Sequence, residues 1–238
     1  IEERHYFSDD KEKIATLPTS RSNKTSGEQT PIHLAQDTLF DIPAYLPDTA
    51  LVQRDMWKMY NNLAETDKQI GAVLQQLKDD GLYDNAIIVF YADHGGPLPR
   101  QKRLIYDSGL KVPMIIRFPQ GKGAGQLDDR LVSFVDFAPT TLALAGMAIP
   151  SHMQGYDFIG GTENTRGYIH AAADRFDGFT DSIRAVKDKR FKYIRNYRPQ
   201  QGYYLPVRYR EKIPTMQELL RLKAVGKLTV YQAQWFRQ

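Results

Sequence analysis

Asp93 and His94 stand side by side directly after the apolar run AIIVFYA at residues 86–92. A strand of this composition would be buried on both faces, so its first polar residues lie at its carboxyl end, where open α/β sheets keep their ligands. The backbone leaves the pleat there, so adjacent side chains no longer have to point in opposite directions. Both can then reach one cation, which makes Asp93 and His94 candidate metal ligands. The alternative is that Asp93 caps the next turn and His94 is merely exposed.

The residues that follow the pair favour an anion beside the cation. Gly95 and Gly96 let the backbone come close to a ligand. Arg100, Lys102 and Arg103 place positive charge within a few residues of the pair. A cation and a lysine together suit an anionic tetrahedral group. Arg100 is a candidate substrate contact, with a simple loop charge as the alternative.

Composition bounds the possible functions. The 238 residues carry 32 basic and 28 acidic side chains, a mixed surface that permits acidic ligands without demanding nucleic acid. Since cysteine is absent, disulfides, zinc-thiolate sites and a cysteine nucleophile are excluded within these residues. No apolar stretch approaches the roughly 18 residues that a membrane helix needs. The chain starts at Ile1 without methionine, and we expect it to be a piece of a longer polypeptide.

The elements predicted around the pair alternate between helix and strand. A helix is expected from Asp48, as N-cap, to a stop at Gly81, with Asp67 on its apolar stripe as a buried, hydrogen-bonded carboxylate. Strands are expected at 86–92, 112–118 and 131–137. This order predicts an α/β fold with part of a mostly parallel sheet flanked by helices.

The pattern changes after residue 160. Strand-like runs flank the tight connection KDKR at 187–190, and a helix is expected from Thr215 onward. An antiparallel hairpin plus a helix predicts a C-terminal α+β subdomain. The expected domains are therefore residues 1–160, as part of the α/β domain, and 161–238, as an incomplete subdomain.

Several motifs in one order resemble the sulfatases of the alkaline phosphatase superfamily. The central one runs from Asp93-His94-Gly95 through Lys102 to Gly109 and the strand MIIRFP. It is preceded by DIPAYLPDT and LAETDKQIGAVLQQLKDDG, and followed by VDFAPTTLALAG and SIRAVKDKRFKYIRNY. The layout is most similar to heparan N-sulfatase and related bacterial carbohydrate sulfatases. The resemblance implies the second half of the catalytic domain followed by the C-terminal subdomain.

The resemblance also implies roles for particular residues. Asp93 and His94 would be two ligands of a divalent cation, and Lys102 would bind the sulfate oxygens and help to stabilise the leaving group. Asp174 and Arg175, together with the weaker candidate His152, would contact the sugar. For these last three, ordinary surface positions are the alternative.

The sulfatase nucleophile is missing from this sequence. In the family it is a formylglycine made from Cys/Ser-x-Pro-Ser-Arg, and an Asp pair near the N-terminus completes the metal site. The closest stretch, TLPTSR at 16–21, begins with Thr16 and carries Ser20 where arginine is required, so we reject it. The chain is expected to be the later portion of a sulfatase and to be inactive by itself.

Metal identity depends on which argument is followed. A histidine ligand favours Zn²⁺ or Mn²⁺, because Ca²⁺ prefers oxygen. The resemblance implies Ca²⁺, which we take as the expected ion. It further implies a sulfated carbohydrate substrate and a periplasmic or secreted enzyme. We also expect association through the exposed sheet edge of the incomplete domain.

Two other functions fit parts of the sequence. Asp-His-Gly at a strand end also serves two-zinc phosphodiesterases and phosphatases of the same superfamily. The basic and aromatic run at 190–210 fits a non-catalytic module that binds anions or single-stranded nucleic acid. No nucleic-acid fold motif accompanies that run, so no nucleic-acid partner is expected.

Overall fold

The computed structural model describes residues 31–160 and 166–237. They form two compact units, one containing residues up to 124 together with 206–237, and the other residues 125–205. The fold is a mixture of helices and antiparallel sheets. The rejected stretch TLPTSR lies outside the described residues.

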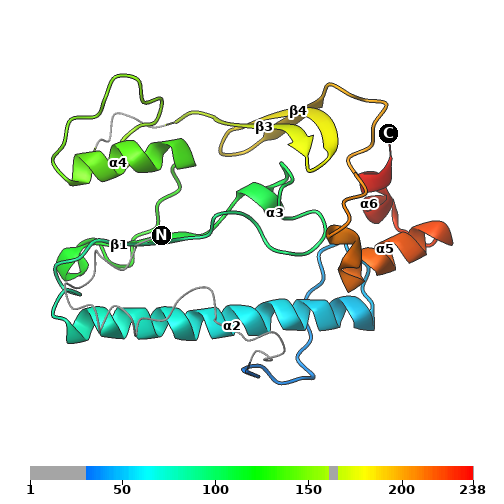
Figure 1. Ribbon diagram of the computed structural model, residues 1–238, viewed down its shortest axis with the longest axis horizontal. Coiled ribbons are helices and arrows are strands. Elements are labelled where there is room, and N and C mark those ends of the chain that lie inside the picture. The colour runs from blue at the N-terminus through cyan, green and yellow to red at the C-terminus, as the bar shows by residue number, and fades with distance from the viewer. Residues whose placement is uncertain (1–30, 161–165, 238) are drawn as a thin grey trace. The chain divides into compact units, whose positions relative to one another are not determined.

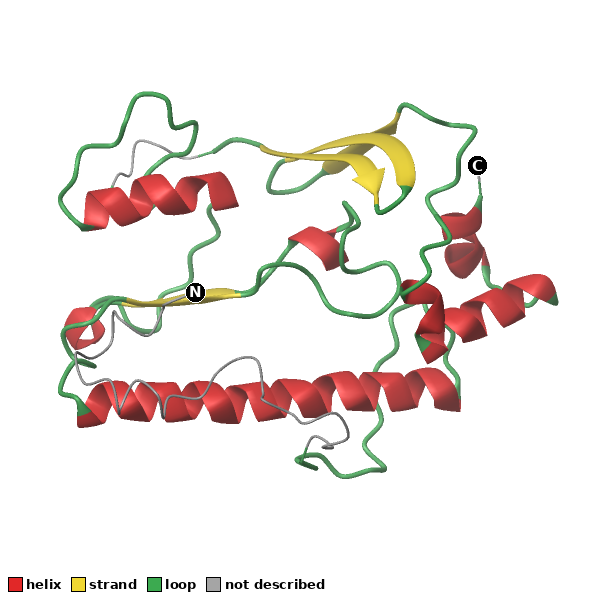
Figure 2. Cartoon of the chain, in the orientation of Figure 1, coloured by secondary structure: helices red, strands yellow, loops and turns green. Residues whose placement is uncertain are grey.

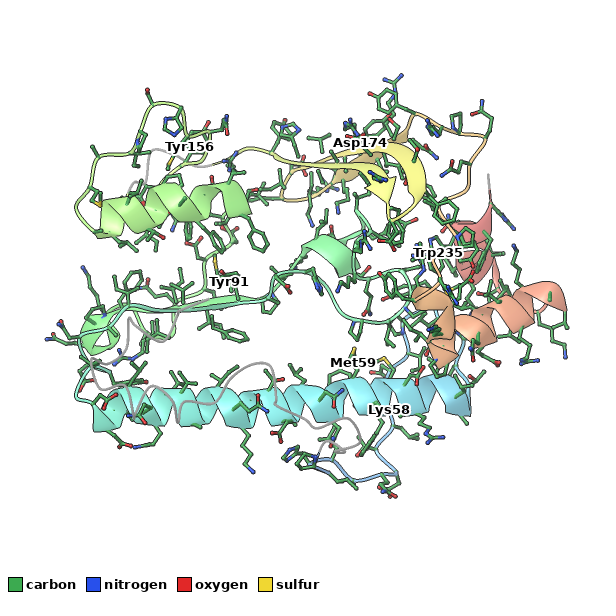
Figure 3. All side chains as sticks on the ribbon, in the orientation of Figure 1. Lys58, Met59, Tyr91, Tyr156, Asp174 and Trp235 are labelled. Atoms are coloured by element: carbon green, nitrogen blue, oxygen red, sulfur yellow. The ribbon has the colours of Figure 1, made fainter. Side chains whose placement is uncertain are left out.

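The first unit contains one long helix and several shorter elements. In chain order they are α2 (Ala50–Asp79), β1 (Ile88–Tyr91), α3 (Asp107–Leu110), β2 (Met114–Arg117), η2 (Pro119–Gly121), η4 (Arg210–Lys212), α5 (Pro214–Ala224), α6 (Val230–Ala233) and η5 (Gln234–Phe236). Figure 1 shows α5 and α6 close to the N-terminal end of α2. In this corner the guanidinium carbon of Arg210 lies 4.8 Å from the ring centroid of Trp235, which is labelled in Figure 3.

The long helix was predicted correctly except at its first residue. Its N-cap is Thr49, whose hydroxyl accepts from the amide of Val52, whereas Asp48 accepts from the side chain of Gln53. Gly81 follows the last turn at φ 70°, a left-handed conformation that glycine adopts without strain. The helix therefore ends where the sequence predicted.

The buried carboxylate of α2 is Asp55, and the prediction for Asp67 was wrong. Asp67 and its stripe neighbour Leu63 are both exposed. Asp55 is buried, and its Oδ2 accepts from the backbone N (2.8 Å) and the Oγ1 (2.7 Å) of Thr215. This pair of bonds joins α5 to α2.

The β1–β2 ribbon is antiparallel, whereas the sequence predicted a mostly parallel sheet. Val89 pairs with Ile116 and Phe90 with Ile115. The turn through residues 93–109 brings the chain straight back along β1 without a crossover helix, which an antiparallel pair does not need. Among the described strands, every paired neighbour runs antiparallel.

Residues 131–137 do not form the strand that the sequence predicted. The residues form η3 (Phe134–Asp136), which continues into α4 (Phe137–Leu144). Ser133 and Asp136 make a capping box, with each side chain accepting from the other residue's amide. This local bonding starts a helix and overrides the apolar pattern of the run.

The second unit contains a three-stranded sheet. Strands β3 (Ile169–Phe176), β4 (Phe179–Lys187) and β5 (Lys192–Asn196) lie in that order, each antiparallel to the next. Figure 2 shows the sheet as a twisted ribbon of arrows. The predicted hairpin around KDKR is confirmed as β4–β5. The predicted C-terminal helix is α5, which belongs to the unit of α2.

Asp136 joins separate segments of the second unit. The residue is 1% exposed, and its carboxylate accepts from the amides of Ser133 and Tyr156 and from the guanidinium of Arg166. Burial acts to raise the pKa of Asp136, but the bonds from Arg166 and the two amides outweigh it and lower the pKa below its usual range. The carboxylate therefore stays charged in the folded chain.

Candidate metal and anion site

Asp93 and His94 follow β1 immediately, as the sequence predicted. Tyr91 ends the strand (Figure 3), and the backbone then turns. The Asp93 Oδ1 lies 3.6 Å from the His94 Nε2, and 83% of the Asp93 side chain and 39% of the His94 side chain are exposed. The two donor atoms thus face the same region of space and are accessible to an ion.

The ring of His94 is oriented as a metal ligand requires. Its Nδ1 lies 2.8 Å from the carbonyl oxygen of Gly95. A carbonyl only accepts hydrogen bonds, so the proton belongs on Nδ1 and the lone pair on Nε2. Metal-binding histidines are commonly fixed in this way. The donor types and their orientation fit a divalent cation.

The pair is an incomplete ligand set. Within residues 31–160 and 166–237, no three His, Asp or Glu side chains gather into a metal-binding cluster. Two protein ligands are fewer than the structural or catalytic sites of Zn²⁺ or Ca²⁺ provide. Any such site needs donors from beyond the described residues.

Close backbone contacts fix the loop that follows the pair. The amide of Gly95 donates to the carbonyl of Gly109 (3.0 Å), and that of Lys102 to the carbonyl of Gly96 (3.0 Å). A Cβ on Gly95 would lie 1.9 Å from the carbonyl oxygen of Ser108. The glycines are therefore required for the folding of the loop on itself. This folding holds the backbone of Lys102 beside the turn that carries His94.

Arg100 makes internal contacts in this loop. Its guanidinium carbon lies 5.0 Å from the ring centroid of Tyr45 and 4.7 Å from that of Tyr106. Its Nη1 donates to the carbonyl of Tyr231 (3.3 Å), and its backbone has φ 65°. These contacts tie the loop to two distant segments of the first unit. A substrate contact by Arg100 stays a prediction.

The predicted sugar contacts lie in the second unit. Asp174, labelled in Figure 3, is exposed on β3 and pairs with Arg184 on the neighbouring strand β4. The distance from the Asp174 Oδ1 to the Arg184 Nη1 is 2.5 Å. Arg175 donates through Nε to the carbonyl of Asp177 (3.0 Å), and His152 is exposed in the connection after α4. The three sugar-contact roles stay predictions.

Sequence reasoning missed two buried carboxylates that join distant segments, one within each unit. Asp55 and Asp136 are both buried, and their principal partners, Thr215 and Arg166, are far away in the sequence. Only Asp136 had a readable signal, the Ser-x-x-Asp spacing of a capping box.

Two protein families match this chain. The Sulfatase family matches residues 4–147, and the N-sulphoglucosamine sulphohydrolase C-terminal family matches residues 100–212. The chain belongs to the sulfatase family.

Curated relatives with similar sequences are carbohydrate sulfatases by name. An ulvan-active sulfatase of Formosa agariphila is 66% identical over 217 residues, which cover 91% of this chain and 36% of that protein. Human N-sulphoglucosamine sulphohydrolase is 30% identical over 112 residues, covering 47% of this chain and 22% of that protein. The N-acetylglucosamine-6-O-sulfatase of Bacteroides thetaiotaomicron is 40% identical over 93 residues, covering 37% and 17%. The chain thus spans about a third of the length of the first of these relatives.

A solved structure has a similar fold. The structure of BT4656 in complex with its substrate D-glucosamine-2-N,6-O-disulfate superposes with a TM-score of 0.53 over 79% of this chain and 42% of that one, at 24% identity. In the parts of this chain that the structure describes, no helix combines the length and the apolar composition needed to cross a membrane.

Proposed function

We propose that this chain is the later portion of a sulfatase that hydrolyses a sulfate ester or N-sulfate of a carbohydrate. The observation that carries the proposal is the geometry of Asp93 and His94. In a segment that matches the family, a strand ends in two donors 3.6 Å apart, and a hydrogen bond to Gly95 leaves the His94 Nε2 lone pair free. Lys102 follows in a loop that is folded back on the same turn.

The functional group of each side chain suits the role proposed for it. Asp93 and His94 would hold a divalent cation, Ca²⁺ by family resemblance with Zn²⁺ or Mn²⁺ as alternatives. When bound, the ion would supply positive charge to the sulfate oxygens. Lys102 would donate hydrogen bonds from its ammonium group to those oxygens and stabilise the negative charge that grows on them. The formylglycine nucleophile and the remaining ligands would come from outside this chain, so the chain alone would be inactive.

The proposed substrate and the proposed cellular location are based on the relatives. Their names specify ulvan, N-sulphoglucosamine and N-acetylglucosamine 6-sulfate, which support a sulfated carbohydrate here too. Asp174, Arg175 and His152 are the proposed sugar contacts, with Arg100 as a further substrate contact. Bacterial enzymes on such polymers favour a periplasmic or secreted location. The β1–β2 ribbon would belong to a larger, mostly parallel sheet, and residue 160 would divide the catalytic domain from the C-terminal subdomain.

Sulfate release by the full-length enzyme tests the proposal. We expect His94→Gln to reduce both metal content and turnover, and Lys102→Ala to reduce turnover about a hundredfold or more with the metal retained. Lys122→Ala is the matched control, because Lys122 is another exposed lysine of the first unit. Stoichiometric zinc together with hydrolysis of phosphodiesters and no release of sulfate would support the phosphatase alternative.

A further inference from the structure

The exposed face of β5 carries an unusual set of side chains. Along this edge strand of the sheet, alternate residues point to one face. The residues on the exposed face, counting those just before and after the strand, are Phe191, Tyr193, Arg195 and Tyr197. We call these four residues the edge row. Three exposed aromatic side chains in alternation form a continuous apolar row, and such patches mark ligand or partner sites more often than single exposed residues do.

The rings of the edge row are available for stacking. Phe191 and Tyr193 are each 64% exposed and Tyr197 is 53% exposed. The guanidinium carbon of Arg195 lies 4.6 Å from the ring centroid of Tyr197, and that of Arg190 lies 4.8 Å from the ring of Phe191. From Phe191 to Tyr197 an extended strand covers about 20 Å. The row is therefore longer than a single sugar ring.

The charge around the edge row is strongly positive. Residues 184–198 contain seven basic side chains and one acidic side chain, Asp188. Asp188 lies in the turn, where its Oδ1 accepts from the amides of Arg190 and Phe191. Among the described residues, Arg195 has no carboxylate partner.

The basic side chains nearby are partly neutralised. Arg184, opposite Arg195 in the β4–β5 register, pairs with Asp174, and Lys189 pairs with Asp129. Arg195 and Arg190, by contrast, are the two arginines that lie against the rings of the row.

We propose that the edge row binds a sulfated polysaccharide chain laid along β5. The aromatic faces stack on sugar rings, and Arg195 and Arg190 donate to sulfate oxygens. The choice of a sulfated glycan rests on the proposed function, since a carbohydrate sulfatase meets such chains as its substrates. Single-stranded nucleic acid uses the same mixture of stacking and positive charge, and it is the alternative that the experiment must separate.

Affinity electrophoresis of the full-length enzyme tests the proposal, with heparin, desulfated heparin or single-stranded DNA in the gel. The test variant combines Tyr193→Thr, Arg195→Gln and Tyr197→Thr. Threonine removes each ring but keeps a strand-forming side chain. The control is Arg208→Gln, which removes the same charge from an exposed arginine of the other unit. Circular dichroism and thermal unfolding establish that both proteins are folded.

We expect heparin to retard the wild type and the control equally, with desulfated heparin having little effect. In the test variant the dissociation constant for heparin should rise at least tenfold. Equal retardation of the test variant and the wild type would refute the proposal, as would a wild type that heparin does not retard. Tighter binding of single-stranded DNA than of heparin at equal salt, lost in the test variant, would replace it with the nucleic-acid interpretation.

Sulfate release by the wild-type enzyme is measured separately, so that the two proposals fail independently. An enzyme that releases no sulfate but binds heparin through the edge row would contradict the proposed function alone. An enzyme that releases sulfate but binds heparin equally well without the edge row would contradict only the present inference.

Discussion

At the scale of single residues, Asp136 has the largest predicted effect on stability. Asp136→Asn preserves the shape of the side chain but leaves Arg166 without its partner, and the Arg166 side chain is only 17% exposed. Breaking a buried pair from one side costs about 3–5 kcal/mol, and we expect the lower end because Arg166 retains some contact with water. Urea unfolding of the chain measures the loss.

The control is Asp128→Asn, which removes a pair with Arg130 at the surface. An exposed pair of this kind contributes about 0–1 kcal/mol. If the two variants lost equal stability, the bonding of Asp136 would not have the structural role inferred for it.

The same carboxylate predicts a dependence on pH. The folded chain lowers the pKa of Asp136 below its unfolded value. A lowered pKa contributes stability that is fully present above the unfolded value, about 3.9, and is lost as the pH falls through the folded value. The difference in unfolding free energy between wild type and Asp136→Asn should therefore be constant from pH 5 to pH 7 and shrink below about pH 4. A difference that stays constant down to pH 2 would contradict the assignment.

Contacts between side chains were predictable from the sequence where the residues are neighbours in the chain. Asp93, His94 and Gly95 are consecutive, and the structure places the two donors within 3.6 Å of each other and adds only the orientation of the histidine ring. The partners of Asp55 and Asp136 were not predictable, because Thr215 and Arg166 are brought to them by the fold. Periodicity indicates which residues are buried, but it does not identify their partners across the chain.

At the scale of elements, the bond between α2 and α5 should be measurable by itself. Thr215→Val keeps the volume of the side chain but removes the hydroxyl that donates to the Oδ2 of Asp55. Losing one partner of a buried hydrogen bond costs about 1–3 kcal/mol. We expect that loss of stability, with faster amide hydrogen exchange in α5.

Thr66→Val is the matched control for this prediction. The hydroxyl of Thr66 bonds only to the carbonyl of Asn62 within α2 and joins no second element. Exchange in α5 that is equally fast in both variants would mean that the Asp55 bond does not anchor the helix.

The loop after the metal pair gives a second prediction at this scale. In Gly109→Ala the new Cβ would lie 2.2 Å from the carbonyl oxygen of Leu104 and 2.4 Å from that of Gln101. Because both obstacles are backbone atoms, the loop must move, and turnover by the full-length enzyme should fall with the displacement of Lys102. Gly71→Ala is the control, since nothing lies within 4 Å of its added Cβ inside α2. It should leave turnover unchanged and stabilise the helix by about 0.5–1 kcal/mol.

Elements were predicted better than their pairing. The long helix and the β4–β5 hairpin are present, since each is marked by a period and a stop or a tight turn. The antiparallel direction of β1 against β2 was not predictable, because alternation of strands and helices does not reveal that the 93–109 loop returns without a crossover. The strand expected at 131–137 failed because the capping box at Ser133 starts a helix.

At the scale of the whole molecule, the β1–β2 ribbon exposes apolar side chains on both faces. Val89 and Tyr91 are exposed on one face and Ile115 on the other. A ribbon of two strands is marginally stable alone and needs packing on its apolar surfaces. The chain spans 36% of the length of a relative that is 66% identical to it. We therefore expect the remainder of a full-length enzyme to bury these side chains, and we expect the isolated chain to associate through them.

Ile115→Lys should reduce association of the isolated chain but destabilise the full-length enzyme. In the isolated chain a lysine on exposed β2 disfavours strand-to-strand association, so light scattering should report less oligomer. In the full-length enzyme the same lysine would be a charge in a buried position, and thermal unfolding should occur at a clearly lower temperature. Val225→Lys serves as the control, because it places a lysine at another exposed apolar position of the first unit, outside the ribbon. A monomeric isolated chain, together with a full-length enzyme that tolerates Ile115→Lys, would show that the ribbon needs no cover.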